Sequence, residues 1–211
     1  MINVLIVDDH TIVRQGLKQI LAETSDIVVT AEAQDGQEAI EKVRQNGYDV
    51  VLLDVALPGA DGLSVMRVLR QEKPSVAVLV LSAYPEEQYA VRFLKAGAAG
   101  YLTKESASDE LILAIRKVAQ GGKYVTQSLA ERLAGSLASD ADRLPHEALS
   151  NREYQVMRMI ASGKTVGEIA EELSLSVKTV STYRTRILEK LQLSNNADIM
   201  RYALTWGVVK W

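Results

Sequence analysis

The chain has 211 residues, enough for one large domain or two small ones, and its 47% hydrophobic and 24% charged content is ordinary for a globular protein. It contains no cysteine, which excludes disulfides, thiolate metal sites and cysteine nucleophiles. The apolar stretch within residues 1–7 meets two aspartates too soon for a signal peptide, and no apolar run approaches the ~20 residues that cross a bilayer. We therefore expect a cytoplasmic protein without membrane contact.

The net charge of −3 is unevenly divided along the chain. Residues 1–142 carry 14 Lys+Arg and 20 Asp+Glu, a net of −6, whereas residues 143–211 carry 10 and 7, a net of +3. An acidic first part and a mildly basic second part indicate two functions, the second involving a polyanion.

The first part alternates predicted strands with predicted helices. Strands are expected at 4–7, 27–31, 50–53, 76–81 and 100–102, and helices at about 11–23, 35–46, 63–71, 86–96 and 107–120. The second helix is expected to end at a C-terminal cap on Asn46-Gly47, and Leu57 to Gly62 to form a loop. Strict alternation implies right-handed crossovers, and hence an α/β fold with a doubly wound, five-stranded parallel sheet.

Chemically active residues stand at or just beyond the ends of four of these strands. They are Asp8, Asp9, Asp54, Ser82 and Lys104. In a parallel sheet all carboxyl ends point the same way, so we expect these side chains to meet at one rim, where ligands of open α/β sheets bind.

The residue types indicate phosphoryl chemistry. Three carboxylates repel one another unless a cation is present, and Mg²⁺ suits a few carboxylates plus a phosphate. Lys104 offers a compact positive charge, Ser82 a hydroxyl donor, and Asp54 a nucleophile that would form an aspartyl phosphate. Two simpler interpretations stand beside this one. Asp9 is a candidate cap for a helix that starts near Thr11, and the lone His10 is too weak a signal for a metal ligand.

Separate segments now form a recognisable pattern: Val7-Asp8-Asp9-His10, Leu53-Asp54 with Pro58 and Asp61-Gly62, Leu81-Ser82-Ala83, and Gly100-Tyr101-Leu102-Thr103-Lys104. Over residues 2–122 the chain resembles the receiver domain of bacterial two-component response regulators, which has a flavodoxin-like fold. The resemblance implies that Asp54 accepts a phosphoryl group from a sensor histidine kinase and that Lys104 contacts the phosphate. It also implies that Asp8, Asp9, Asp54 and the backbone carbonyl of Ala56 hold Mg²⁺, and that Ser82 and Tyr101 are the switch pair. Leu57 and Glu105 depart from the usual methionine and proline.

Between the two parts we expect a linker over residues 123–147. Leu129, Leu133 and Leu137 recur at four-residue spacing, which predicts an amphipathic helix from Tyr124 to Leu137. The polar residues 138–147 lack periodicity, and His146 among them is expected to be solvated. The predicted domains are therefore 1–122, this linker, and 148–211.

The last part reads as a small all-α domain. Ser150 with Glu153, and Thr165 with Glu168, match the capping box and open helices at about 151–162 and 166–173. Further helices are expected at 177–191 and 197–206. Two short helices joined by a tight turn predict a helix-turn-helix, whose second helix enters the major groove of double-stranded DNA.

The third helix of this domain carries short polar residues opposite its core face, with cations beside them. Together with Leu149-Ser150, Glu168-Ile169-Ala170 and Lys178-Thr179-Val180, this pattern resembles the LuxR-type domain of the NarL/FixJ family of response regulators. The predicted DNA contacts are Lys178, Thr179, Ser181, Thr182, Arg184, Thr185, Arg186 and Lys190. The chain departs from the family pattern at Ser181 and Tyr183, where lysine and histidine are common, and at Asn196, which replaces a frequent arginine.

The sequence thus predicts a transcription factor, not an enzyme, that dimerises when a histidine kinase phosphorylates Asp54. One alternative is a phosphohydrolase with an aspartyl nucleophile, which would need a second acid where Ala56 stands. The other is a phosphorylation-independent DNA-binding regulator with a degenerate receiver, and the presence of all five site residues argues against it.

Overall fold

A computed structural model describes residues 1–57, 62–84, 86–131 and 145–209. The chain divides into two compact units, Met1–Ala141 and Asp142–Trp211, which are treated separately below. The finer boundaries expected at residues 122 and 147 remain predictions. Of the expected loop after the third strand, residues 58–61 lie outside the described residues.

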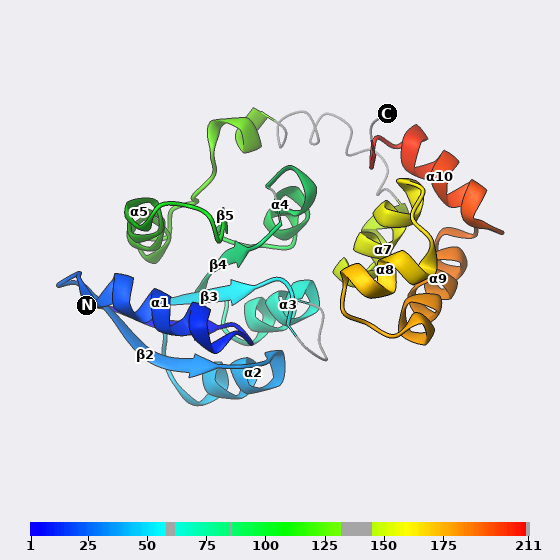
Figure 1. The fold of residues 1–211 in the computed structure, drawn as a ribbon. Coiled ribbons are helices and arrows are strands. Elements are labelled where there is room, and N and C mark those ends of the chain that lie inside the picture. Colours follow the sequence, from blue (N-terminus) through cyan, green and yellow to red (C-terminus); the bar gives the residue numbers. More distant parts are fainter. Residues whose placement is uncertain (58–61, 85, 132–144, 210–211) are drawn as a thin grey trace. The chain divides into compact units, whose positions relative to one another are not determined.

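The first unit is a five-stranded parallel sheet with the strand order β2-β1-β3-β4-β5 (Figure 1). Its strands are β1 (Ile2–Val7), β2 (Ile27–Ala33), β3 (Val50–Asp54), β4 (Ala77–Ser82) and β5 (Gly100–Thr103). Its helices are α1 (Thr11–Ala22), α2 (Gly36–Gln45), α3 (Gly62–Glu72), α4 (Glu86–Lys95) and α5 (Ser108–Ala119). The predicted α/β fold is confirmed.

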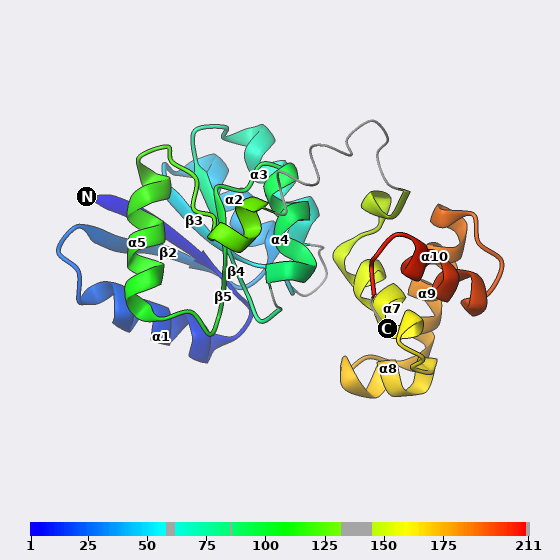
Figure 2. The same ribbon diagram turned by 90° about the horizontal axis from the view of Figure 1, so that it is seen from above.

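Helices cover both faces of the sheet, which is why its central strands are apolar almost throughout. All five residues of β3 are buried. On one face, residues of α1 and α5 such as Leu17, Leu21, Leu111 and Ile115 pack on the strands in a single apolar cluster. The views in Figures 1 and 2 place α2, α3 and α4 on the other face.

Two details of the helix ends differ from expectation. The helix α2 ends at Asn46 as expected, but Asn46 is extended (φ −129°) and Gly47 has no positive φ, so this end is not a left-handed cap. The N-cap residue of α1 is His10, without a side-chain capping bond, so the prediction that Asp9 caps this helix is wrong. The aspartate that contacts the start of α1 is Asp8, whose Oδ1 accepts a hydrogen bond from the His10 amide at 2.8 Å.

After α5 the chain returns to the outer edge of the sheet. Gly100 and Tyr124 form a parallel β-bridge, and the Tyr124 amide donates to the Ala99 carbonyl at 2.8 Å. Thr126 then donates its hydroxyl to Glu86 Oε1 at 2.5 Å, at the start of α4. Residues 127–131 are helical and Leu129 is buried, as predicted, while Leu133 and Leu137 lie outside the described residues.

The second unit is all-helical, as predicted. It contains the 3₁₀ turn η1 (Pro145–Ala148) and the helices α7 (Asn151–Ala161), α8 (Val166–Glu172), α9 (Val177–Leu191) and α10 (Asn196–Thr205). Both capping boxes are formed, since Ser150 and Thr165 each exchange hydrogen bonds with the glutamate three residues on. The expectation for His146 is wrong: it is buried, with Nδ1 3.0 Å from the Tyr202 hydroxyl, because η1 packs against this domain.

Candidate functional site

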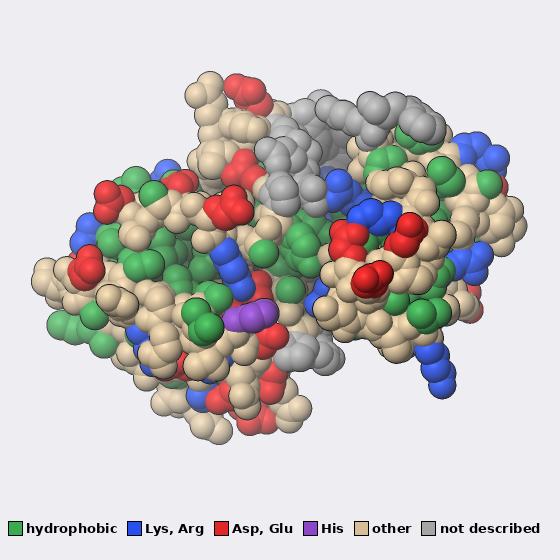
Figure 3. All heavy atoms as spheres, in the orientation of Figure 1, with side chains coloured by type: hydrophobic (Ala, Val, Ile, Leu, Met, Phe, Trp, Pro, Cys, Tyr) green, Lys and Arg blue, Asp and Glu red, His purple; other side chains and the backbone are tan. Residues whose placement is uncertain are grey.

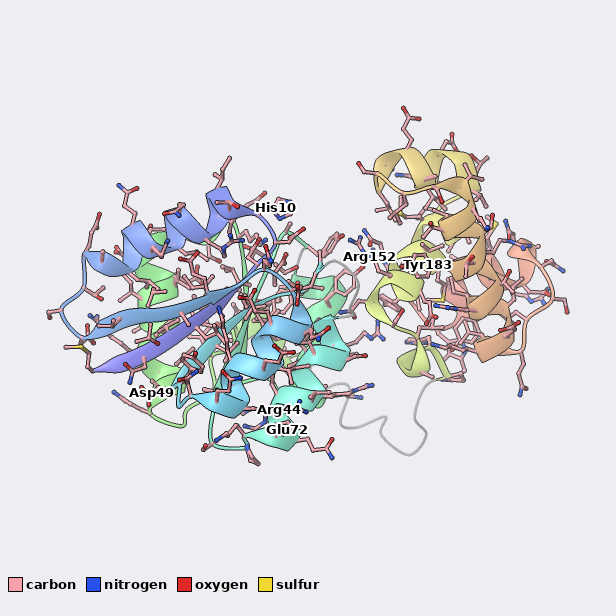
Figure 4. The ribbon with its side chains drawn as sticks, turned by 90° about the horizontal axis from the view of Figure 1, so that it is seen from below. His10, Arg44, Asp49, Glu72, Arg152 and Tyr183 are labelled. Carbon is pink, nitrogen blue, oxygen red and sulfur yellow. The ribbon has the colours of Figure 1, made fainter. Side chains whose placement is uncertain are left out.

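The register of the sheet brings the predicted acidic residues to one rim. Val7 pairs with Leu53, so that Asp8 follows β1 beside the end of β3 at Asp54. Ser82 pairs with Thr103, and the Lys104 amide donates to the Ser82 carbonyl at 2.7 Å. Figure 4 shows His10 at this rim and Asp49 at the opposite end of the sheet, and it marks Arg44 of α2 and Glu72 of α3, which form an ion pair. Strand alignment alone therefore assembles residues that are distant in sequence.

Lys104 joins two of the carboxylates. Its Nζ lies 2.6 Å from Asp8 Oδ2 and 3.1 Å from Asp54 Oδ2. Asp8 and Asp54 are 2% and 3% exposed, so water screens this cluster poorly. Asp9 is more open, and Figure 3 shows acidic and histidine side chains adjoining on this face of the first unit. The site is thus a buried ion-pair cluster with one accessible side.

Burial and charge act in opposite directions at this cluster. Burial raises the pKa of Asp54 above its ordinary value; Lys104 opposes the rise, and the negative charge of Asp8 adds to it. Burial alone would lower the pKa of Lys104, but Asp54 and Asp8 outweigh it and the pKa is raised. The lysine is therefore charged at neutral pH, while ionised Asp54 lacks full compensation.

The donor set fits a divalent cation. Single ligand atoms of Asp8, Asp9, His10 and Asp54 all lie within 4.8 Å of one another. The buried oxygens Asp9 Oδ1 and Asp54 Oδ2 also lack a well-formed hydrogen bond. Carboxylate oxygens with unused lone pairs and a net negative surplus are what a hard, oxygen-preferring ion requires. His10 Nδ1, 2.7 Å from Asp9 Oδ1, lies closer to the cluster than sequence reasoning expected.

Ser82 and Tyr101 are both fully buried, and their hydroxyls are joined by a direct hydrogen bond as well as through the main chain of Tyr84. The Tyr84 amide donates to Ser82 Oγ at 3.0 Å, and the Tyr101 hydroxyl donates to the Tyr84 carbonyl at 2.9 Å. Burial raises the pKa of the Tyr101 phenol further above neutrality. Sequence reasoning missed Tyr84. No signal could have revealed it, because its main chain makes both bonds and any residue supplies a main chain.

The predicted DNA-contact residues gather on the exposed side of α9. Val180, Ile187 and Leu191 are buried against the rest of the domain, and the opposite side is exposed. The exposed members of the predicted set are Lys178, Ser181, Thr182, Thr185, Arg186 and Lys190, whereas Thr179 and Arg184 are half-buried. Figure 4 marks Tyr183 on this helix and Arg152 on α7.

Two of the cations on α9 bind within their own domain. Lys190 Nζ lies 2.6 Å from Oε2 of the buried Glu153, and Arg184 Nε donates to Asn196 Oδ1 at 2.5 Å. Lys178 and Arg186 are thus the α9 cations best placed to approach phosphates. Asn196, noted in the sequence as a departure, therefore has a structural partner on the recognition helix.

Two family models match the chain. Residues 4–116 match the response regulator receiver domain, and residues 147–203 match the bacterial regulatory proteins of the luxR family. The first match alone covers more than half of the chain. The chain belongs to the response regulators of two-component systems.

Relatives of similar length support this assignment. The response regulator is 39% identical to UvrY of Escherichia coli K12 over 209 residues, 99% of this chain and 96% of that one. It is 40% identical to GacA of Pseudomonas viridiflava over 210 residues, 99% and 98% of the two chains. Both relatives are named response regulators. This chain is accordingly a DNA-binding transcription factor with the acidic site of a receiver, and the prediction that it is not an enzyme is confirmed by its family.

Solved structures extend the likeness to both units. A structure of RcsB of Salmonella typhimurium has a TM-score of 0.61 at 27% identity and covers 96% of this chain and 98% of its own. A further RcsB structure, bound to the promoter P1flhDC in the presence of the phosphomimetic BeF₃⁻, has a TM-score of 0.59 at 27% identity and covers 95% and 97%. Across the described residues, every helix is too short or too polar to cross a membrane.

Proposed function

We propose that this response regulator takes a phosphoryl group on Asp54 from a sensor histidine kinase. The observation that carries the proposal is the position of Lys104 Nζ between Asp8 and Asp54 in an otherwise carboxylate-lined site. An Asp54 oxygen attacks phosphorus while the bond between phosphorus and the donor nitrogen breaks, which leaves an aspartyl phosphate. Lys104 then contacts a phosphoryl oxygen.

Asp8, Asp9 and Asp54, with the backbone carbonyl of Ala56, would hold Mg²⁺. When bound, this ion supplies positive charge against the phosphoryl oxygens. The two buried carboxylate oxygens described above, which lack a well-formed hydrogen bond and keep lone pairs for an ion, support this choice of ligands. The Ala56 amide supports the position of Asp54 directly, since it donates to that carboxylate.

Ser82 and Tyr101 form the proposed switch. A phosphoryl group on Asp54 offers new acceptors to the Ser82 hydroxyl, which now accepts from the Tyr84 amide. Movement of Ser82 would break its bond with the Tyr84 amide and so shift Tyr84, whose carbonyl accepts the hydrogen bond from the Tyr101 hydroxyl. We propose that this change favours a homodimer, in which two α9 helices address two half-sites of double-stranded DNA in the cytoplasm. Dimers of RcsB on DNA provide a precedent.

The test of the proposed acceptor is labelling by acetyl phosphate with Mg²⁺, followed by intact-mass spectrometry. The full chain is expected to gain one phosphoryl group, and Asp54→Asn none. The matched control is Asp109→Asn, an exposed carboxylate in the first turn of α5, which should label like the natural chain. Undiminished labelling of the Asp54→Asn variant would remove Asp54 as the acceptor.

The main rival is a receiver that no longer signals. Under that hypothesis, DNA affinity and the size of the protein in solution are the same with and without acetyl phosphate. Our proposal expects phosphorylation to shift the chain toward a dimer by light scattering and to tighten DNA binding in the same sample. Phosphoryl labelling that changes neither the size of the protein nor its DNA affinity would favour a receiver that no longer signals.

A further inference from the structure

The middle of the exposed face of α9 carries no residue that reads bases through two hydrogen bonds. Such recognition of guanine or adenine needs Arg, Lys, Asn or Gln. The central exposed positions are instead Ser181, Thr182 and Thr185. Lys178 lies at the N-terminal end of this face, and Arg186 lies at its margin.

The two threonines have already used their hydroxyl hydrogens. Thr182 Oγ1 donates to the Lys178 carbonyl at 2.9 Å, and Thr185 Oγ1 donates to the Ser181 carbonyl at 3.1 Å. A hydroxyl has a single hydrogen to donate. Each side chain therefore presents to the outside its methyl group and the lone pairs of its oxygen, and no donor.

Val177 enlarges this apolar character. It is the first residue of α9 and is 56% exposed, although β-branched apolar residues are normally buried. It lies one turn before Ser181 on the same side of the helix. The residues near the N-terminus of a recognition helix are those that reach base edges, so Val177 belongs to the part that enters the groove.

The far end of the same face limits how much of the helix can approach DNA. Glu189 is exposed about two turns after Thr182 and would repel phosphates. Close approach is therefore confined to residues 177–185 of α9, the part of the helix that carries these methyl groups. The base feature in the major groove that matches a methyl-rich surface is the C5-methyl group of thymine.

We propose that the response regulator selects its DNA sites mainly by apolar contact between Thr182, Thr185 and Val177 and the methyl groups of thymines in each half-site. The inference rests on the proposed DNA-reading role of α9 and adds the chemical feature that α9 reads. Lys178 and Arg186, at the borders of this face, are left to contact phosphates.

The test uses the full chain, phosphorylated with acetyl phosphate and Mg²⁺, and a duplex chosen by it from a random-sequence library. Each thymine of the selected half-site is then replaced singly by deoxyuridine, which removes the methyl group and keeps every hydrogen-bonding group. Loss of one buried methyl contact should weaken binding about fourfold at each contacted position.

Paired variants separate the methyl group from the hydroxyl. Thr182→Ser removes the methyl group, and we expect about fourfold weaker binding to the thymine duplex and no discrimination of deoxyuridine at the contacted position. Thr182→Val keeps a methyl group there and should bind both duplexes within twofold of the natural chain. The matched control is Thr205→Ser, because Thr205 on α10 is also exposed and donates to the carbonyl four residues earlier at 2.9 Å.

Three outcomes would overturn the inference. In the first, affinity changes less than 1.5-fold at every deoxyuridine position. In the second, Thr182→Val loses discrimination while Thr182→Ser retains it, which assigns readout to the hydroxyl oxygen. In the third, the library yields no preferred sequence, which would also refute the proposed role of α9, whereas the first two leave that role intact.

Discussion

Asp54 is a buried carboxylate with one cation and one like-charged neighbour beside it. Replacing a buried, incompletely compensated charge by a neutral group of the same shape is often stabilising. We expect Asp54→Asn to raise the free energy of unfolding of the first unit by about 1–2 kcal/mol in the absence of Mg²⁺. Lys104 keeps its 2.6 Å contact with Asp8 in this variant, so that the lysine is not left unpaired. Chemical denaturation in a chelating buffer measures the difference.

Addition of Mg²⁺ should make the natural chain more stable to unfolding than Asp54→Asn. An ion that binds the folded state alone stabilises it by about 2.7 kcal/mol at one hundred times its dissociation constant. The natural chain should gain this stability and Asp54→Asn much less, while Asp109→Asn should follow the natural chain. Equal Mg²⁺ responses in all three proteins would contradict the ligand set proposed here.

Glu153 is a buried acid of the second unit. Burial acts to raise its pKa, but the bonds with Lys190 and Ser150 outweigh burial and hold the pKa below its usual range. A carboxyl whose folded pKa is depressed contributes stability above its unfolded pKa, about 4.3, and loses it as the pH falls through the folded value.

Replacement of this acid should therefore have a pH-dependent cost. Glu153→Gln is expected to destabilise the second unit by about 2 kcal/mol at pH 7, and the deficit should shrink below pH 4. Glu172→Gln is the matched control, since Glu172 pairs with Lys164 but is half exposed, and it should cost less than 1 kcal/mol. A pH-independent deficit would show that packing, and not charge, explains the loss. Thermal unfolding followed by circular dichroism between pH 3 and 7 makes the comparison.

The element that sets α9 at its angle is the tight turn after α8. Ser174 in this turn has φ +52°, a left-handed conformation that favours glycine. Ser174→Gly should raise the free energy of unfolding by roughly 0.5–1 kcal/mol, because relief of left-handed strain exceeds the added entropy of the unfolded chain. Ser162, which ends α7 at φ −83°, provides the control, and Ser162→Gly should destabilise. Urea titration of both variants measures these changes, and a loss of stability in Ser174→Gly would show that Ser174 is not strained.

Elements governed by local chemistry are those that sequence predicts best. The limits of α9 are those expected, and both capping boxes form, because the cap, the glutamate and the apolar stripe lie within a few residues. The return of Tyr124 to β5 was not foreseen, since a bridge between segments 24 residues apart leaves no local pattern. The burial of His146 was missed for the same reason: its partner Tyr202 is 56 residues away.

On the scale of the molecule, charge should govern the strength of DNA binding. The second part has a small positive excess, and two α9 cations are bonded within their own domain. We expect a shallow dependence of affinity on salt, and Lys178→Gln should reduce the slope of log affinity against log salt by about 0.9. Arg201→Gln on α10, where Arg201 pairs with Asp198, should leave the slope unchanged. Fluorescence anisotropy at several salt concentrations tests both, and equal slopes in all proteins would remove Lys178 as a phosphate contact.

The candidate site shows why whole-molecule geometry is partly readable from sequence. Asp8 and Lys104 are 96 residues apart, yet their contact follows from one topological rule, that parallel strands end on the same side. The distances within the site and the protonation of its residues cannot be predicted from sequence in this way. Which oxygen the lysine approaches, and how far burial raises the pKa of Asp54, depend on packing that no motif encodes.

The glycine at the start of β5 has a consequence beyond local packing. A Cβ on Gly100 would lie 2.7 Å from the Tyr124 carbonyl oxygen, so the absence of a side chain is what lets the chain close over this strand. An uncovered outer strand presents free amides and carbonyls on which strands of other molecules can assemble. By folding its own backbone over that position, the protein occupies part of a surface that would otherwise invite aggregation.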